Sequence, residues 1–171
     1  MKMEMSLDGY VGAEGVPSNW PVRYYDDELT AYETELLSAA GVHAMGRHSY
    51  EEMGPYWQTA DDPFAPVMND IPKAVFSRTL ERGDWPVTRV FRDLESGMAE
   101  LRDEDGGPVL VHGGSGLVQQ LTRLGLVDEL HINLQPEVFG SGLPLFGAPG
   151  SFQLQDVRRF ARGTVALTYT R

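Results

Sequence analysis

The chain contains no cysteine, and this absence excludes three kinds of chemistry. Without thiols there is no disulfide framework, no cysteine-based zinc site and no thiol nucleophile. No stretch approaches the ~20 consecutive apolar residues of a membrane-spanning helix, and residues 1–6 lack the apolar core of a signal peptide. We therefore expect a cytoplasmic protein with no membrane partner.

Positive charge is also scarce. The chain has 14 Lys and Arg residues against 25 Asp and Glu residues, which gives a formal net charge of -11. An acidic protein repels the phosphate backbone of nucleic acids unless basic residues are locally concentrated, and no basic run occurs here. His43, His112 and His131 lie on predicted strands without metal-ligand spacing. We therefore expect neither a nucleic-acid partner nor a metal site.

The length of 171 residues and the 42% hydrophobic content suit one domain, so we predict a single domain over residues 1–171. Strand-like and helix-like segments alternate, which predicts an α/β class and a three-layer α/β/α fold with a mostly parallel central sheet. The expected strands cover residues 1–5, 42–45, 73–76, 88–91, 109–111 and 128–134. The expected helices begin at Asp26 or Asp27, near residue 46, at 94 and at 117. Residues 152–161 and 165–170 predict antiparallel strands at the C-terminus.

A glycine-rich turn follows the strand at 109–111, where His112-Gly113-Gly114-Ser115-Gly116 leads into a helix. Glycines allow the backbone to approach a ligand closely, and the free N–H groups at a helix start favour an anion. The turn lacks the third glycine of a dinucleotide-binding Rossmann motif and the lysine of a P-loop. A phosphate cradle and an ordinary tight turn are therefore both compatible with this segment alone.

Two further polar segments follow predicted strands, namely Gly46-Arg47-His48-Ser49 and Ser77-Arg78. The carboxyl ends of parallel strands meet at one edge of a sheet, so we expect both segments to converge with the glycine turn. Two guanidinium groups, two hydroxyls and a helix start suit a pyrophosphate and one further phosphate. This set favours NADPH over NADH. The alternatives are solvated surface arginines and a His48 that pairs with a carboxylate.

The order of these motifs resembles the dihydrofolate reductase fold. It is more similar still to the C-terminal reductase domain of bacterial riboflavin biosynthesis and its stand-alone relatives. The resemblance covers nearly the whole chain, through residues 5–12, 45–50, 76–78, 112–116, 127–131 and 140–146.

The resemblance implies a role for each matching residue. The phosphates of the cofactor would be held by Gly46, Arg47, His48 and Ser49, and its 2′-phosphate by Ser77 and Arg78. The pyrophosphate would lie on Gly113, Gly114, Ser115, Gly116 and Leu117, with His112 beside it and a cis peptide joining Gly113 to Gly114. Val11 and Gly12 would lie beside the nicotinamide, and Trp20 would border the substrate. Homodimers joined by C-terminal strands are also implied.

We expect hydride transfer from NADPH to a C=N or C=O carbon of a small, pteridine-like or pyrimidine-like molecule. Asp26, Asp27 or water would supply the proton. Residues 51–71 contain no Arg or Lys to receive the carboxylate of folate, and Arg23 is the only cation in residues 13–45. The substrate is therefore expected to be neither dihydrofolate nor a phosphorylated pyrimidine.

Three alternatives stay open. The chain could bind a nucleotide without turnover, or it could use a flavin or deazaflavin in place of the nicotinamide. A hydrolase or transferase ranks last, because Ser115 has no assignable His and Asp partners.

Overall fold

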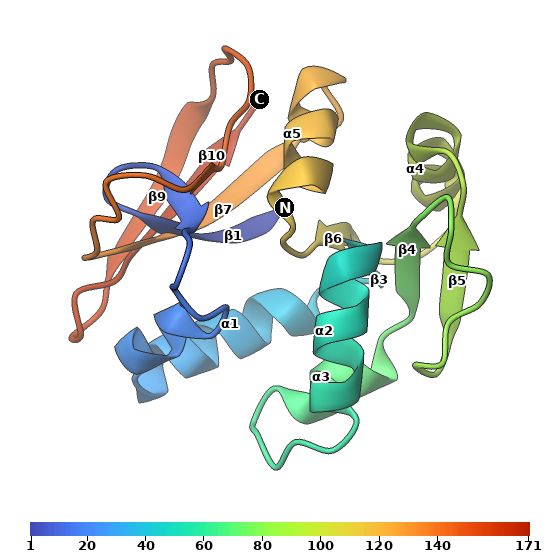
Figure 1. Cartoon of the computed structure of the whole chain (residues 1–171), viewed down its shortest axis with the longest axis horizontal. Helices are drawn as coiled ribbons and strands as arrows, with labels where there is room; N and C mark the ends of the chain where they lie inside the picture. The colour runs from blue at the N-terminus through green and yellow to red at the C-terminus, as the bar shows by residue number, and fades with distance from the viewer. The chain divides into compact units, whose positions relative to one another are not determined.

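The structure, a computed structural model, describes all 171 residues and divides them into two compact units. Unit 1 comprises Met1–Thr30 and Ser115–Arg171, and unit 2 comprises Ala31–Gly114. The helix α1 (Asp27–Ser38) carries the chain from unit 1 into unit 2, and α5 (Ser115–Arg123) begins where the chain returns. Figure 1 labels these elements.

Unit 2 is built on a four-stranded parallel sheet with the strand order β5-β4-β3-β6. Its strands are β3 (Val42–Gly46), β4 (Lys73–Phe76), β5 (Thr88–Phe91) and β6 (Val109–Val111). The sequence predicted all four strands to within one residue, because each is a short apolar run bounded by turn residues. Parallel strands of this kind are usually connected by helices that cross over and cover the faces of the sheet.

Three helices complete unit 2, and they are α2 (Arg47–Trp57), α3 (Ala65–Asp70) and α4 (Leu94–Asp103). The α2 helix continues through Pro55 to Trp57. The loop expected before β4 contains α3, whose Pro66 occupies the first turn, where a missing N–H costs no helical hydrogen bond. The core of this unit centres on the buried side chains of Met45, Val75 and Trp85.

Unit 1 contains a second four-stranded sheet with the order β1-β7-β10-β9. Its strands are β1 (Lys2–Ser6), β7 (Glu129–Gln135), β9 (Gln153–Arg159) and β10 (Val165–Thr170). The β1 and β7 strands are parallel, whereas β10 pairs antiparallel with both β7 and β9. The antiparallel C-terminal strands are therefore confirmed. Gly163, with φ of 98°, makes the turn of their hairpin.

Shorter elements complete unit 1. The strands β2 (Tyr10–Gly12) and β8 (Leu143–Pro144) pair with each other, and a 3₁₀ helix, η1 (Trp20–Tyr24), lies within a segment expected to be a loop. The α5 helix begins two residues earlier than predicted. The mixed α/β class with a largely parallel sheet is confirmed. None of the helices has both the length and the apolar character needed to cross a bilayer.

Candidate functional site

The carboxyl edge of the unit 2 sheet gathers the predicted phosphate-binding segments. The strands β4, β3 and β6 are neighbours and parallel, so the residues that follow them emerge at the same edge. These residues are Ser77 and Arg78 after β4, Arg47 to Ser49 after β3, and His112 to Gly114 after β6. The structure therefore brings together, within one unit, segments that lie up to 68 positions apart between residues 46 and 114.

Arg47 reaches from the end of β3 toward the end of β4. Its Nη1 donates a hydrogen bond to Thr79 Oγ1 at 3.0 Å, and its Nε lies 3.6 Å from Glu51 Oε1. Both Arg47 and His48 are exposed, whereas Ser49 is buried. The first turn of α2 contains no acidic residue, and the Gly46 cap supplies no side-chain acceptor. The N–H groups of this turn are therefore left for a ligand or for water.

Arg78 lies at the end of β4 beside a turn that Ser77 stabilises. The Ser77 hydroxyl oxygen accepts hydrogen bonds from the N–H groups of Thr79 and Leu80, at 3.2 and 3.0 Å. The Ser77 hydroxyl oxygen therefore already accepts two backbone hydrogen bonds, and its O–H hydrogen is the group it could offer to a phosphate. Arg78 itself is exposed.

Sequence reasoning missed a third arginine at this edge. Arg92 directly follows β5, and its Nη1 donates to the carbonyl of Ser77, which directly follows β4, at 3.0 Å. The following residue, Asp93, caps α4 by accepting from the N–H of Ser96 at 3.0 Å. Hydrogen bonds from Ser96 chiefly lower the pKa of Asp93, and the charge of Arg78 contributes. The rule applied to β3 and β4, an arginine within two residues of a strand's carboxyl end, would have found Arg92.

An open hollow of about 500 Å³ lies beside this edge. Its lining comes from β5, from Arg92 and Asp93, and from α4. The residues that line the hollow therefore include the carboxyl end of β5 and the arginine that follows it, Arg92.

The glycine turn after β6 is open to its surroundings. A Cβ added to Gly113 would meet no atom within 4 Å, and a Cβ added to Gly114 would approach Ser49 Oγ at 3.0 Å. Gly114 has φ of 86°, which a residue with a side chain rarely adopts. The backbone contains no cis peptide bond, so the expected cis linkage between these glycines is wrong for this structure. The positive φ of Gly114 makes the turn with trans peptides.

His112 precedes the glycines and is buried, unlike the glycine turn itself. Its N–H donates to the Ala44 carbonyl at 2.8 Å, and its ring packs edge-on against His43 with 4.5 Å between centroids. The structure therefore gives His112 a packing role within unit 2, and its contact with a cofactor stays a prediction.

The remaining predicted cofactor residues belong to unit 1. The α5 helix begins at Ser115, and a Cβ on Gly116 would meet nothing within 4 Å. Leu117 has a buried side chain, so only its backbone N–H is available to a phosphate. Within unit 1, the open Gly116 and the start of α5 suit a phosphate group, and within unit 2 the arginines at the strand ends also suit one.

Trp20, Val11 and Gly12 lie together in unit 1. The Trp20 Nε1–H donates to the Val11 carbonyl at 3.3 Å, and its ring meets the edge of Phe139 at 5.0 Å between centroids. Trp20 is buried, whereas Val11 and Gly12 are half-buried. The residues expected beside the nicotinamide and the substrate are therefore held together by direct contacts.

The two predicted proton donors differ in their surroundings. Asp26 caps α1, because its Oδ1 accepts the N–H of Leu29 at 2.9 Å. This hydrogen bond chiefly lowers the pKa of Asp26, with further backbone contributions from Ala161 and Arg162. An ionised carboxylate has no proton to donate, so the capping role does not favour Asp26 as an acid. Asp27 is exposed in the first turn of α1. Their catalytic roles stay predictions.

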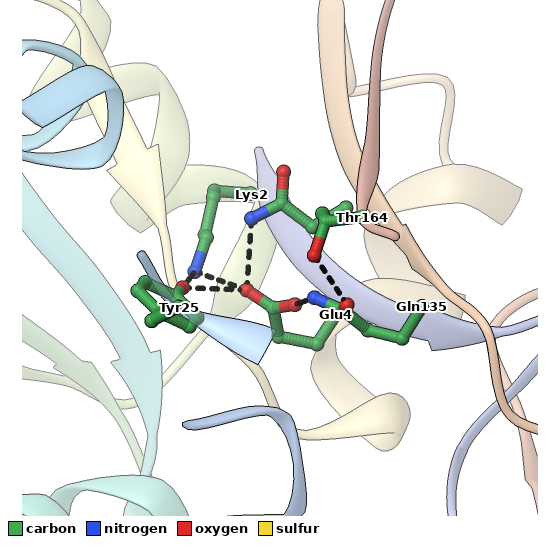
Figure 2. A network of polar contacts seen from close by, with 6 residues as sticks. Lys2, Glu4, Tyr25, Gln135 and Thr164 are labelled. Atoms are coloured by element: carbon green, nitrogen blue, oxygen red, sulfur yellow. Dashed lines mark hydrogen bonds and ion pairs between the residues drawn. The ribbon is translucent and has the colours of Figure 1, made fainter. Parts of the chain in front are cut away.

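A second polar group of residues in unit 1 was not predicted. We call it the Glu4 cluster, and its members are Lys2, Glu4, Tyr25, Asn133, Gln135 and Thr164 (Figure 2). It joins β1 and β7 to the residue that follows η1 and to the turn before β10. The only sequence signal was the alternation of Lys2 and Glu4 with methionines in β1.

The model of one protein family, the RibD C-terminal domain, matches residues 1–167. The chain belongs to this family. Among curated proteins, it is 25% identical over 177 residues to the uncharacterized protein YyaP of Bacillus subtilis, a match that covers 99% of this chain and 92% of YyaP. RibD C-terminal domains are riboflavin-pathway reductase-like domains, so a reductase role follows at this coarse level.

Solved structures share the fold. A putative riboflavin biosynthesis protein from Shewanella sp. PV-4 superposes with a TM-score of 0.78 at 22% identity, covering 99% of this chain and 96% of that one. A diaminohydroxyphosphoribosylaminopyrimidine deaminase/5-amino-6-(5-phosphoribosylamino)uracil reductase from Thermotoga maritima gives 0.69 at 19% identity, covering 99% of this chain and 55% of that one. The resemblance to the dihydrofolate reductase-like fold is therefore confirmed.

Proposed function

We propose that this RibD C-terminal domain is an NADPH-dependent reductase. The observation that carries the proposal is the carboxyl edge of the unit 2 sheet, where Arg47, Arg78 and Arg92 follow three adjacent strands. Bound NADPH supplies a hydride. Arg78 and Arg92 would hold its 2′-phosphate, because guanidinium groups engage phosphate oxygens in a bidentate way.

Within unit 2, the glycine turn and the start of α2 would hold the remaining phosphates through backbone N–H groups. Trp20, with Val11 and Gly12, would border the nicotinamide and the substrate. The substrate class is a small pteridine-like or pyrimidine-like molecule with a C=N or C=O bond. Residues 51–71 offer a folate tail only acidic side chains as charged groups, so we expect negligible turnover of dihydrofolate.

Titration with NADPH and NADH tests this proposal. Loss of a hydrogen bond to a charged group costs about 1.5–3 kcal/mol, so Arg47→Ala and Arg78→Ala should each weaken NADPH binding about tenfold to a hundredfold. NADH binding should weaken less in Arg78→Ala. Arg82→Ala is the matched control, since Arg82 is exposed and paired only loosely with Asp84, at 3.8 Å. Equal affinity for both nucleotides, unaffected by any of these variants, would contradict the proposal.

A second candidate, a nucleotide-binding module without turnover, is favoured by the use of Asp26 as a helix cap. It predicts tight NADPH binding with no oxidation by any acceptor. A flavin or deazaflavin cofactor predicts instead that the purified protein is yellow or binds these compounds in preference to NADPH.

We also propose that the protein is a cytoplasmic homodimer. The edge strand β9 is exposed along its whole length, and its Leu154 and Val157 are 52% and 48% exposed. An exposed edge strand with apolar side chains is a template for pairing with another chain. Light scattering of Val157→Lys beside the wild type tests this, with a shift to monomer as the expected result.

A further inference from the structure

The unit 1 sheet has an unusual interior face. Side chains alternate across a strand, and the register pairs Glu4 with Asn133 and Ser6 with Gln135, so all four lie on one face of β1 and β7. Ser6 and Gln135 are fully buried, and Asn133 is 2% exposed. Polar side chains buried in this way must be hydrogen-bonded to remain stable, and their hydrogen bonds converge on Glu4.

Glu4 lies at the centre of this face with its carboxylate saturated by donors (Figure 2). Its Oε1 accepts from Lys2 Nζ at 2.8 Å and from Asn133 Nδ2 at 2.9 Å, and its Oε2 accepts from Gln135 Nε2 at 2.6 Å. Burial by itself raises the pKa of Glu4, but the charge of Lys2 and these hydrogen bonds together lower it. Glu4 is therefore a fixed negative charge and has no proton to give.

Tyr25 completes the cluster through its hydroxyl. The hydroxyl donates to Glu4 Oε1 at 2.8 Å and accepts from Lys2 Nζ at 3.2 Å. In the structure the hydroxyl hydrogen of Tyr25 is donated to Glu4, so transfer to a substrate requires the O–H to turn away from Glu4. The Lys2 amine lies within hydrogen-bond reach to replace that proton. The side chains of Lys2 and Glu4 are 15% and 16% exposed, so water reaches the cluster and can return a proton to Lys2.

The position of Tyr25 in the chain connects the cluster to the predicted substrate residues. Tyr25 directly follows η1, which begins at Trp20, and its N–H donates to the Val22 carbonyl at 3.1 Å. A five-residue 3₁₀ segment rises about 10 Å, so Trp20 and Tyr25 lie at the two ends of one short element. Trp20 in turn contacts Val11. Asp26, the next residue, points its carboxylate to the start of α1 instead.

We propose that Tyr25 is the proton donor of the reduction, with Lys2 and Glu4 as positioning residues. This inference rests on the proposed reductase function. The substrate carbon accepts the hydride from NADPH, and the electron pair of the C=N or C=O bond moves onto nitrogen or oxygen. The Tyr25 O–H bond breaks as the new N–H or O–H bond forms. Lys2 then protonates the phenolate, and water reprotonates Lys2, so the cycle consumes one NADPH and one proton.

The test compares Tyr25→Phe with Tyr24→Phe. Tyr24 is the matched control, because it is the adjacent tyrosine and its hydroxyl contacts Glu137, outside the Glu4 cluster. NADPH affinity and melting temperature are measured first for each protein. NADPH oxidation is then followed with three acceptors, namely 7,8-dihydropterin, 5-amino-6-(5-phosphoribosylamino)uracil and its dephosphorylated form. The phosphorylated pyrimidine is expected to be the poorer of the last two, because Arg23 is the only cation in residues 13–45. The kcat, the KM and the solvent deuterium isotope effect are compared.

We expect Tyr25→Phe to bind NADPH within about twofold of the wild type and to lose about a hundredfold or more of kcat, the range for a positioned acid. Tyr24→Phe should keep its kcat within about twofold. The solvent isotope effect should rise in Tyr25→Phe, because protonation then limits the rate. A merely structural role for Tyr25 would not produce this rise.

The failures are separable. A wild type that does not bind NADPH overturns the proposed function and this inference with it. A Tyr25→Phe variant with unchanged kcat overturns the inference and leaves the reductase function standing. NADPH binding without oxidation by any of the three acceptors also counts against a catalytic Tyr25 and supports the binding module.

Discussion

His43 gives the sharpest prediction for stability. Its ring is fully buried on β3, where Nε2 lies 3.2 Å from the Leu37 carbonyl and Nδ1 has no hydrogen-bond partner. In the neutral ring Nε2–H donates to Leu37, and protonation would place a second N–H, at Nδ1, without an acceptor. Burial therefore lowers the pKa of His43 from 6.5 to about 4, and the nearby charge of Lys73 adds to this.

The sign and size of the effect follow from the shift. The unfolded chain binds the His43 proton below about pH 6.5, whereas the folded chain resists it until about pH 4. The stabilisation is therefore complete above pH 6.5 and is lost as the pH falls toward 4. At about 1.4 kcal/mol for each unit of pKa, the loss amounts to about 3 kcal/mol.

The perturbation is His43→Gln, since the glutamine amide can still donate toward Leu37 but does not titrate. Urea unfolding followed by tryptophan fluorescence gives the free energy of unfolding at intervals from about pH 4 to pH 7. The difference between wild type and variant should shrink by about 3 kcal/mol as the pH falls. His48→Gln, at an exposed histidine, controls for the loss of one imidazole. If His43→Gln and His48→Gln reduced the pH dependence of the free energy of unfolding equally, burial of His43 would be refuted as the cause.

Three further predictions concern the backbone. A Cβ on Gly41 would lie 2.5 Å from the backbone nitrogen of Gly107, so Gly41→Ala should cost about 1–3 kcal/mol in urea unfolding; Gly106→Ala, where a Cβ meets nothing within 4 Å, should change stability little. Gly97→Ala would press on the rings of two phenylalanines at 2.8 Å and should cost a similar ~1–3 kcal/mol, measured in the same way. The carboxylate of Asp8 accepts two backbone N–H groups of the loop after β7, so Asp8→Asn should lower the melting temperature. Hydrogen bonds, chiefly from Ser6, lower the pKa of Asp8, and this difference should therefore disappear as the pH falls through that lowered pKa.

Local sequence patterns predicted the four strands of the unit 2 sheet. The strands of unit 2 are short apolar runs, and their bounds match the prediction closely. The parallel arrangement then predicted that segments after β3, β4 and β6 share an edge, because that consequence follows from topology alone. The helix α3 is not among the predicted helices, because it is short and lies in a segment rich in Pro and Asp, although proline is common in a first helical turn.

The Glu4 cluster could not be predicted in the same way. Asn133 and Gln135 lie 129 and 131 positions along the chain from Glu4, and no local pattern connects residues so distant. The alternation of methionines with Lys2 and Glu4 predicted a short first strand and indicated nothing about what covers its polar face. The structure covers the second face as well, so both sides of β1 are largely buried. Tertiary packing decides whether the polar face of a strand is buried, and the alternation of residues along the strand carries no information about that packing.

This covered polar face bears on where the proton of the reaction originates. A carboxylate at the start of α1 was the natural expectation from sequence, but Asp26 has a lowered pKa and serves the helix backbone. The adjacent Tyr25 instead joins an ion pair of Lys2 and Glu4 that keeps both a negative and a positive charge beside its hydroxyl. Opposite charges so arranged cancel at long range, while each still orients the hydroxyl through a hydrogen bond. A neutral acid with a cationic neighbour to resupply it suits transfer to a weakly basic nitrogen or oxygen near neutral pH better than a capped aspartate does.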